Sequence, residues 1–238
     1  MSSDEMKRKA AHAALAHLPE AGVVGLGTGS TTRWFIEAVG ELVQAGRRFT
    51  AVPTSSASRT LAERCGIPLL DDAGPWRIDV CVDGADEVNG ELELIKGGGG
   101  AHTREKIVNH AARVNVIIVD DSKLVEKLGS TRKVPLEVLP FGLRTTLQAL
   151  RALGEPEVRL NGGAPLMSDS GNYIVDLATG PISEPRKLDA ALQGLPGVVE
   201  TGLFIGRANV VLVASSAGVH ELRRAEGSGA APASRKLS

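Results

Sequence analysis

The sequence predicts an α/β protein with a mostly parallel central sheet and a second, smaller α+β domain. Short apolar runs alternate with helix-like segments through the first half of the 238 residues, as in a parallel sheet wrapped on both faces. Glycines directly follow the first apolar run, as in a strand–turn–helix unit. Beyond about Leu128 the order becomes β-α-β-β-α-β, that of a split βαβ sandwich.

The elements of the first part follow one another closely. An Ala-rich helix is expected over 3–18, then a buried strand at 21–27 and a helix at 30–39. Further strands are expected at 49–54, 67–70, 78–83 and 114–120, with helices at 55–66 and 103–113.

The second part has its own set of elements. Strands are expected at 133–140, 157–161, 173–178 and 198–206, with helices at 143–154 and 183–194. The strand at 209–216 is of the buried type and can return to the first sheet. The expected bounds are therefore 1–128 with 206–224 for the larger domain, 129–205 for the smaller one, and 225–238 for a disordered tail rich in small and polar residues.

Composition and charge exclude several classes of protein. Hydrophobic residues make up 42% and charged residues 23%, as in soluble globular chains. The net charge, 27 − 28 = −1, provides no basic field for nucleic acid. No apolar run suits a signal peptide or a membrane span, so we expect a cytoplasmic protein with no membrane partner. Cys65 and Cys81, the only cysteines, are expected to be reduced, mostly buried thiols.

The segment GLGTGST, residues 25–31, places glycines at a strand end and hydroxyls at a helix start. Backbone N–H groups and the positive helix end can hold an anion there, although a bare tight turn is the other interpretation. The dinucleotide fingerprint fails, because its third glycine is replaced by Ser30 and the second strand ends without an acidic residue. No Lys follows the glycines as the Walker pattern requires. The remaining interpretation is a binding site for a small phosphate monoester.

The segment DGADE, residues 83–87, ends a predicted strand, where open α/β sheets bind ligands. Asp83 and Asp86 can converge on one polyol or one proton, and a solvated Asx-type turn is the alternative. Magnesium also suits carboxylates. Since no neighbouring histidine or further oxygen ligand in register requires it, we expect no metal and no cofactor.

The segment KGGGGAHTREK, residues 96–106, is the most unusual one. Four successive glycines cost conformational entropy, which close approach of a ligand to the backbone would explain. Lys96 precedes them. Thr103 is expected to cap the next helix, with Glu105 in its first turn, where an acidic side chain is stabilised. His102 is expected to face solvent.

The segment DDSK, residues 120–123, ends another predicted strand and brings Lys123 to the same edge. The carboxyl ends of parallel strands meet at one edge of a sheet. The anion loop, the carboxylates and the two lysines are therefore expected to converge on one ligand.

Taken in order, these motifs resemble ribose-5-phosphate isomerases of the A type. The matching segments are GTGST (27–31), DGADE (83–87), KGGGG with TREK (96–106), DDSK (120–123) and EVLPFG (137–142), within residues 1–215. The resemblance implies a Rossmann-like domain with an inserted ferredoxin-like α+β domain and a homodimer or larger oligomer. It also implies cofactor-free interconversion of D-ribose 5-phosphate and D-ribulose 5-phosphate in the non-oxidative pentose phosphate pathway.

The resemblance also implies roles for individual residues. Glu105 is the base that moves a proton between C2 and C1 through an enediolate. Asp83, Asp86 and Lys96 lie beside the sugar and assist ring opening and proton movement. The 28–31 loop, Lys123 and Lys7 are implied to hold the phosphate. The full set of implied substrate-binding residues is Lys7, Thr28, Gly29, Ser30, Thr31, Gly84, Ala85, Gly97, Gly98, Gly99 and Lys123.

Elementary chemistry supports two of these roles independently. A proton next to a carbonyl is weakly acidic, so its removal needs an ionised carboxylate within reach and positive charge near the developing oxyanion. Glu105 and Lys96 suit those needs.

Two alternatives to the isomerase function remain open: a coenzyme A transferase in which a glutamate forms a thioester, and a non-catalytic sugar-phosphate sensor of the kind found in transcription regulators.

Overall fold

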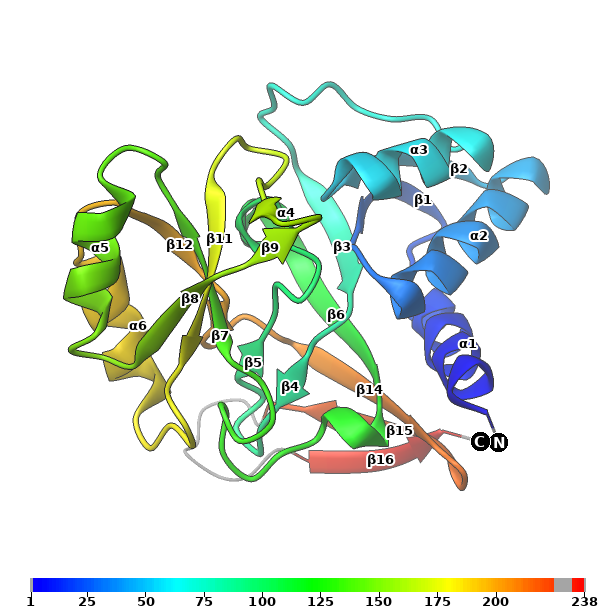
Figure 1. The fold of residues 1–238 in the computed structure, drawn as a ribbon. Helices are drawn as coiled ribbons and strands as arrows, with labels where there is room; N and C mark the ends of the chain where they lie inside the picture. Colours follow the sequence, from blue (N-terminus) through cyan, green and yellow to red (C-terminus); the bar gives the residue numbers. More distant parts are fainter. Residues whose placement is uncertain (1, 225–232, 238) are drawn as a thin grey trace. The chain divides into compact units, whose positions relative to one another are not determined.

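The computed structural model describes residues 2–224 and 233–237, and the chain forms two compact units (Figure 1). The first unit comprises residues 1–84, 105–123 and 207–238, and the second comprises 85–104 and 124–206. The domain bounds that the sequence suggests stay a prediction. The fold class is confirmed, because each unit contains the kind of sheet expected for it.

The first unit is built on a sheet of order β16-β15-β14-β6-β3-β1-β2. Strands β2, β1, β3, β6 and β14 are parallel to one another, and β15 and β16 extend the sheet as antiparallel strands. Their bounds are β1 Ala21–Leu26, β2 Arg48–Pro53, β3 Ile78–Asp83, β6 Ala112–Asp120, β14 Val210–Ser215, β15 Gly218–Arg223 and β16 Ala233–Leu237.

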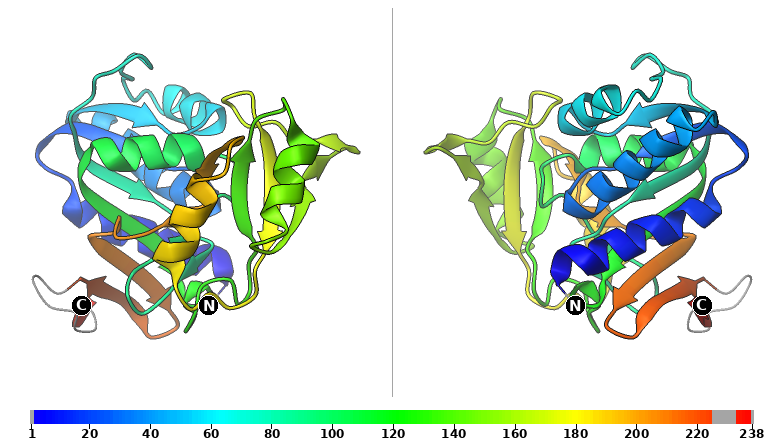
Figure 2. Two further views of the ribbon diagram at one scale, coloured as in Figure 1. Left: turned by 90° about the vertical axis from the view of Figure 1, so that its left-hand side faces the viewer. Right: turned by 90° about the vertical axis from the view of Figure 1, so that its right-hand side faces the viewer.

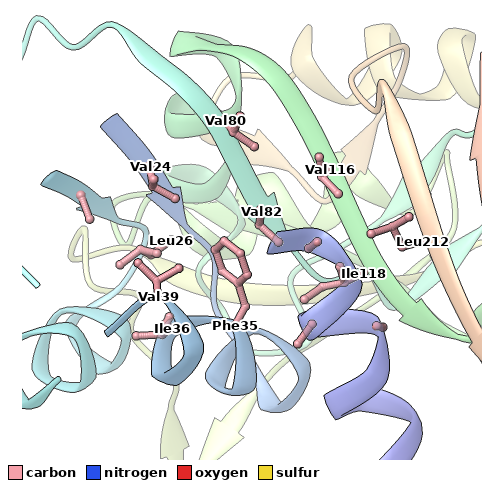
Figure 3. Close-up of a cluster of buried hydrophobic side chains, with 14 of the residues drawn as sticks. Val24, Leu26, Phe35, Ile36, Val39, Val80, Val82, Val116, Ile118 and Leu212 are labelled. Carbon is pink, nitrogen blue, oxygen red and sulfur yellow. The ribbon is translucent and has the colours of Figure 1, made fainter. Parts of the chain in front are cut away.

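Helices cover both faces of this sheet. Helices α1 (Ser3–Ala14), α2 (Ser30–Gln44) and α3 (Ser56–Arg64) pack on one face, and Figure 2 shows α1 and α2 side by side. Their apolar residues meet Val80 and Val82 of β3 in the core of Figure 3. Cys81 points to the opposite face, because strand side chains alternate, and packs there with Val108 of α4 (His102–Ala111). The short 3₁₀ turns η1 (Leu15–His17) and η2 (Asp121–Lys123) follow α1 and β6.

The second unit contains an antiparallel sheet of order β12-β7-β11-β8, with α5 and α6 packed side by side against it (Figure 1). This strand order, with the chain order β-α-β-β-α-β, is ferredoxin-like and confirms that prediction. The bounds are β7 Val134–Val138, α5 Leu143–Leu150, β8 Glu155–Val158, β11 Tyr173–Ala178, α6 Pro185–Gln193 and β12 Val198–Thr201.

The second unit also contains two smaller sheets that were not predicted. Strands β4 (Glu87–Val88), β5 (Leu94–Ile95) and β13 (Leu203–Phe204) form one sheet, and β9 (Leu160–Asn161) and β10 (Ala164–Pro165) form a hairpin. The single strand expected over 198–206 is therefore wrong. Gly202 divides it, because β12 before this glycine pairs with β7 whereas β13 after it pairs with β5 in another sheet.

Two further expectations about elements are wrong. Residues 67–70 form no strand, since only an isolated bridge joins Leu69 to Ala51. The tail was expected to be disordered over 225–238, whereas Ala233–Leu237 is strand β16, because the backbone groups of β15 are available for pairing at that edge. Residues 225–232 and 238 of that expectation lie outside the described residues. Helix ends also differ by a few residues, as at α1, which stops at Ala14.

We predict that the core around Phe35 supplies much of the stability of the first unit. Phe35 is fully buried among the side chains of Figure 3. Its replacement by alanine should lower the free energy of unfolding by about 3–5 kcal/mol, measured by urea denaturation followed by circular dichroism. Leu160, which is 61% exposed, provides the matched control. Leu160→Ala should change this free energy by less than about 0.5 kcal/mol, and equal losses from both variants would contradict the assignment.

Candidate functional site

A turn between β1 and α2 forms one corner of the site in the first unit. Gly27 leaves the sheet with its N–H donating to the Val82 carbonyl oxygen at 2.9 Å. Asp83, at the end of the neighbouring strand and only 3% exposed, accepts through Oδ1 from the Thr28 N–H at 3.1 Å and the Gly84 N–H at 2.7 Å. A Cβ on Gly27 would lie 2.1 Å from Asp83 Oδ1, so the glycine permits this approach. The structure therefore brings Thr28, Asp83 and Gly84 together.

Hydroxyl groups that the sequence analysis did not single out surround the side chain of Thr28. Thr28 Oγ1 lies 2.8 Å from Thr54 Oγ1, 2.8 Å from Ser55 Oγ and 3.2 Å from Ser58 Oγ. Ser58 Oγ also donates to the Gly27 carbonyl oxygen at 2.6 Å. These residues follow β2 at the carboxyl edge of the sheet. Polar residues that directly follow parallel strands meet at this edge, and applying that rule to β2 would have identified Thr54 and Ser55 from the sequence.

The remainder of the turn leads into α2. Gly29 precedes the helix with φ +125°, a conformation that L side chains rarely adopt. Ser30 and Thr31 form the first residues of α2, so their backbone N–H groups lack partners within the helix. This is the arrangement expected of an anion-binding turn.

Helix α4 places Glu105 toward the same edge of the sheet. Ala112, directly after the helix, pairs with Ile78 at the beginning of β3, so α4 runs from the carboxyl edge to the amino edge. Val108, one turn after Glu105, packs closely on β1, where a Cβ on Gly25 would lie 2.9 Å from its Cγ1. Glu105 is only 4% exposed.

The two lysines assigned to the first unit lie on different elements. Lys123 ends η2 directly beyond β6, where Asp120 Oδ1 accepts from the Ser122 N–H at 3.1 Å. Lys123 is half-buried. Lys7 lies on α1, 3.8 Å from Asp4 of the same helix. The role of Lys7 in binding stays a prediction.

The second unit holds the other predicted site residues. Asp86 Oδ2 accepts from the Gly98 N–H at 2.7 Å, so Asp86 and the glycine loop are in contact. Gly97 and Gly100 have φ of +106° and +75°, and a Cβ on Gly98 would lie 2.7 Å from Asp86 Oδ1. A positive φ at Gly97 and Gly100 and the close contact at Gly98 therefore account for three of the four glycines. Ala85 and Gly99 adjoin these residues in the chain.

Lys96 is held directly before this loop. Its side chain is 3% exposed and its Nζ lies 5.4 Å from the centroid of the buried Phe204 ring, a cation–π distance. Its backbone N–H donates to the Gly202 carbonyl oxygen at 2.9 Å. A buried ammonium group thus occupies a fixed position beside the glycines.

Two expectations about the start of α4 are wrong. His102 does not face solvent but is fully buried, because the loop folds over it so that a Cβ on Gly97 would lie 2.7 Å from its Nδ1. Thr103 does not cap the helix, since the helix already begins at His102. The Thr103 hydroxyl instead donates to Glu137, a buried residue that also accepts from Ser168 and Asn172 at 2.8 Å each.

Glu87, the last residue of the DGADE segment, anchors a loop. It is fully buried, and its carboxylate accepts from the backbone N–H groups of Gly129, Thr131 and Arg132 at 2.6–2.8 Å, and from the Thr131 hydroxyl at 2.7 Å. Its role is therefore to hold loop 129–132 in place. A glutamate at this position is hard to distinguish by sequence alone from the acidic site residues beside it.

Across residues 2–224 and 233–237, no three histidine, cysteine, aspartate or glutamate side chains are grouped so as to hold a metal ion. None of the helices in this part of the chain is long and apolar enough to cross a membrane. Cys81 is buried and Cys65 is half-buried, and burial raises the pKa of the Cys65 thiol.

A mainly parallel sheet with buried carboxylates, hydroxyls and a glycine turn at its carboxyl edge is the arrangement at which α/β proteins commonly bind small polar ligands. Comparison with known proteins specifies the class further. The model of the family ribose 5-phosphate isomerase A (phosphoriboisomerase A) matches residues 50–218. The chain belongs to this family.

Individual relatives agree over nearly their whole length. Ribose-5-phosphate isomerase A of Thermosynechococcus vestitus is 47% identical over 221 residues, which cover 90% of this chain and 94% of that protein. The solved structure of ribose 5-phosphate isomerase A from Methanocaldococcus jannaschii has a TM-score of 0.89 at 39% identity, covering 93% of this chain and 100% of that chain. A D-ribose-5-phosphate isomerase in complex with phospho-erythronic acid has a TM-score of 0.90 at 38% identity, covering 94% and 100%.

We predict that Glu87 keeps loop 129–132 closed. In Glu87→Gln the amide group retains one acceptor oxygen and turns a donor toward other donors, so stability should fall by about 1–3 kcal/mol. Trypsin should then cut after Arg132 or Lys133 faster than in the unchanged protein. Glu126→Gln, at an exposed glutamate nearby, is the control and should leave cleavage unchanged. Equal cleavage rates in the two variants would contradict the anchoring role.

Proposed function

We propose that this protein interconverts D-ribose 5-phosphate and D-ribulose 5-phosphate, as an aldose–ketose isomerase of the non-oxidative pentose phosphate pathway. Family membership together with the full set of ordered motifs carries this proposal. A relative with nearly the same fold binds phospho-erythronic acid, a phosphorylated acid one carbon shorter than the sugar. Such an acid resembles the charged enediolate more closely than the sugar itself.

Glu105 is proposed as the base that removes the C2 proton and returns it to C1. Its position in the first turn of α4 suits this role, since the helix dipole favours a carboxylate there. The surrounding protein buries it, so it meets the substrate in a partly desolvated environment. A positioned general base contributes roughly 10²- to 10⁴-fold to the rate.

Positive charge and hydrogen-bond donors are proposed to stabilise the enediolate oxygens. Lys96 supplies a buried ammonium group whose position is fixed by Phe204 and the backbone. Asp83 and Asp86 are oriented by backbone amides, and we assign to them the movement of protons among the sugar oxygens and assistance to ring opening. Preorganised groups of this kind cost no reorganisation during the reaction.

The phosphate is proposed to bind at the turn of residues 28–31. The N–H groups at the start of α2 and the hydroxyls around Thr28 supply donors, and Lys123 and Lys7 supply charge. Gly84, Ala85 and the glycines at 97–99 are proposed to line the sugar. Holding the phosphate fixes the reacting carbons relative to the base, which is how binding energy lowers the barrier.

We also propose that the enzyme acts in the cytoplasm as a homodimer or larger oligomer. The family resemblance implies the assembly, and Phe141, 92% exposed in the EVLPFG segment, is an apolar side chain that such an interface would cover. The coenzyme A transferase and sensor alternatives gain no support from the relatives. An assay of ketose formation from ribose 5-phosphate in chelator-treated buffer tests the activity directly.

We predict that Glu105→Gln lowers kcat by about 10²- to 10⁴-fold, because the amide cannot accept the proton. The variant should retain its circular dichroism spectrum and its unfolding midpoint. Glu20→Gln, at an exposed glutamate, serves as the control with unchanged kcat. Turnover of a folded Glu105→Gln enzyme near the wild-type rate would exclude Glu105 as the base.

A further inference from the structure

Arg159, between β8 and β9, has a guanidinium group fixed from one side by a carboxylate. Its Nε donates to Asp176 Oδ2 at 2.8 Å, and its Nη2 donates to Asp176 Oδ1. The two side chains are only 18% and 20% exposed. A bidentate pair of this kind sets the plane as well as the position of the guanidinium.

The other side of the same guanidinium binds the glycine loop. Nη1 of Arg159 donates to the carbonyl oxygens of Gly97 and Gly98, each at 2.9 Å. Glycine has the greatest backbone freedom of all residues, so a loop of four glycines has many accessible conformations. One fixed cation that binds two successive carbonyls removes much of that freedom.

The glycine loop in turn orients Asp86. The Gly98 N–H donates to Asp86 Oδ2 at 2.7 Å, so Gly98 connects Arg159 to Asp86 through its two peptide groups. Lys96 immediately precedes Gly97. A pocket of about 410 Å³ is lined by Asp86, Gly98, Arg159 and Asp176 among others.

We infer that Arg159 and Asp176 form a positioning pair that fixes the glycine loop, and through it Asp86, in the conformation needed for isomerisation. This inference rests on the proposed function. Arg159 acts through the loop and has no assigned contact with the substrate. Small misplacements of reacting groups lower the reaction rate by large factors. An arginine that does not touch the substrate can therefore control turnover.

A neighbouring ion pair shows what distinguishes this one. Glu157 lies opposite Asp176 in the pairing of β8 with β11, and it pairs with Lys133. The Lys133 and Glu157 side chains are 47% and 69% exposed. Exposed pairs contribute little to stability. Glu157→Gln therefore removes one charge at an adjacent position of the same sheet while leaving the hydrogen bonds of Arg159 in place.

The test combines kinetics with hydrogen exchange of the whole protein. Arg159→Ala and Asp176→Asn should each lower kcat/KM for ribose 5-phosphate, with Arg159→Ala near 10²-fold, about the cost of misplacing reacting groups by 1 Å. Exchange should become faster in the peptide covering residues 96–101 and stay unchanged in the β-strands of the first unit. Added methylguanidinium should restore part of the activity of Arg159→Ala, and Glu157→Gln should match the wild type throughout.

Several outcomes would overturn the inference. Wild-type kcat/KM in folded Arg159→Ala would do so, and so would lost activity with unchanged exchange over 96–101. If Arg159→Ala fails to fold, Asp176→Asn and Arg159→Lys replace it as tests of the inference. Arg159→Lys keeps the positive charge but loses the bidentate guanidinium group. Both variants are then compared with the wild type by kcat/KM and by exchange over 96–101. If the wild-type protein does not isomerise ribose 5-phosphate, the proposed function fails, whereas the exchange data still report whether Arg159 orders the loop.

Discussion

Backbone amides donating to the carboxylates of residues 83–87 are the interaction on which the site depends. Asp83 accepts from the turn after β1, Asp86 from the glycine loop and Glu87 from loop 129–132. Each loop is irregular and rich in glycine or polar residues, so its conformation is not fixed by regular hydrogen bonding. One acidic segment therefore supplies proposed catalytic groups and orders the loops beside them, which couples the local structure to function.

The fold was predictable to the extent that hydrophobic periodicity specifies it. The alternation of buried strands with helices gave the parallel sheet, and the β-α-β-β-α-β order gave the ferredoxin-like sheet. Two-residue strands such as β4 and β5 have no periodicity to read, and β16 forms only because an edge strand accepts it. The failed strand at 67–70 shows that an apolar run alone does not specify a sheet partner.

The positions of several candidate residues were predictable, but their environment was less so. The carboxyl-edge rule correctly placed Asp83 beside the turn at Thr28. Burial of His102 depends on how the glycine loop folds over it, which no local pattern encodes. The contribution of Arg159 comes from a residue far along the chain, whose contacts exist only once β8 and β11 have paired. Long-range contacts of that kind are invisible to motif analysis.

A crystal structure of this chain with phospho-erythronic acid would test the central claim most directly. The account predicts that the ligand phosphate lies within hydrogen-bond distance of the N–H groups at residues 29–31, and that the Glu105 carboxylate lies about 3–3.5 Å from a carbon atom at the acid end of the ligand. A phosphate bound elsewhere, or a Glu105 side chain directed away from the bound acid, would contradict it.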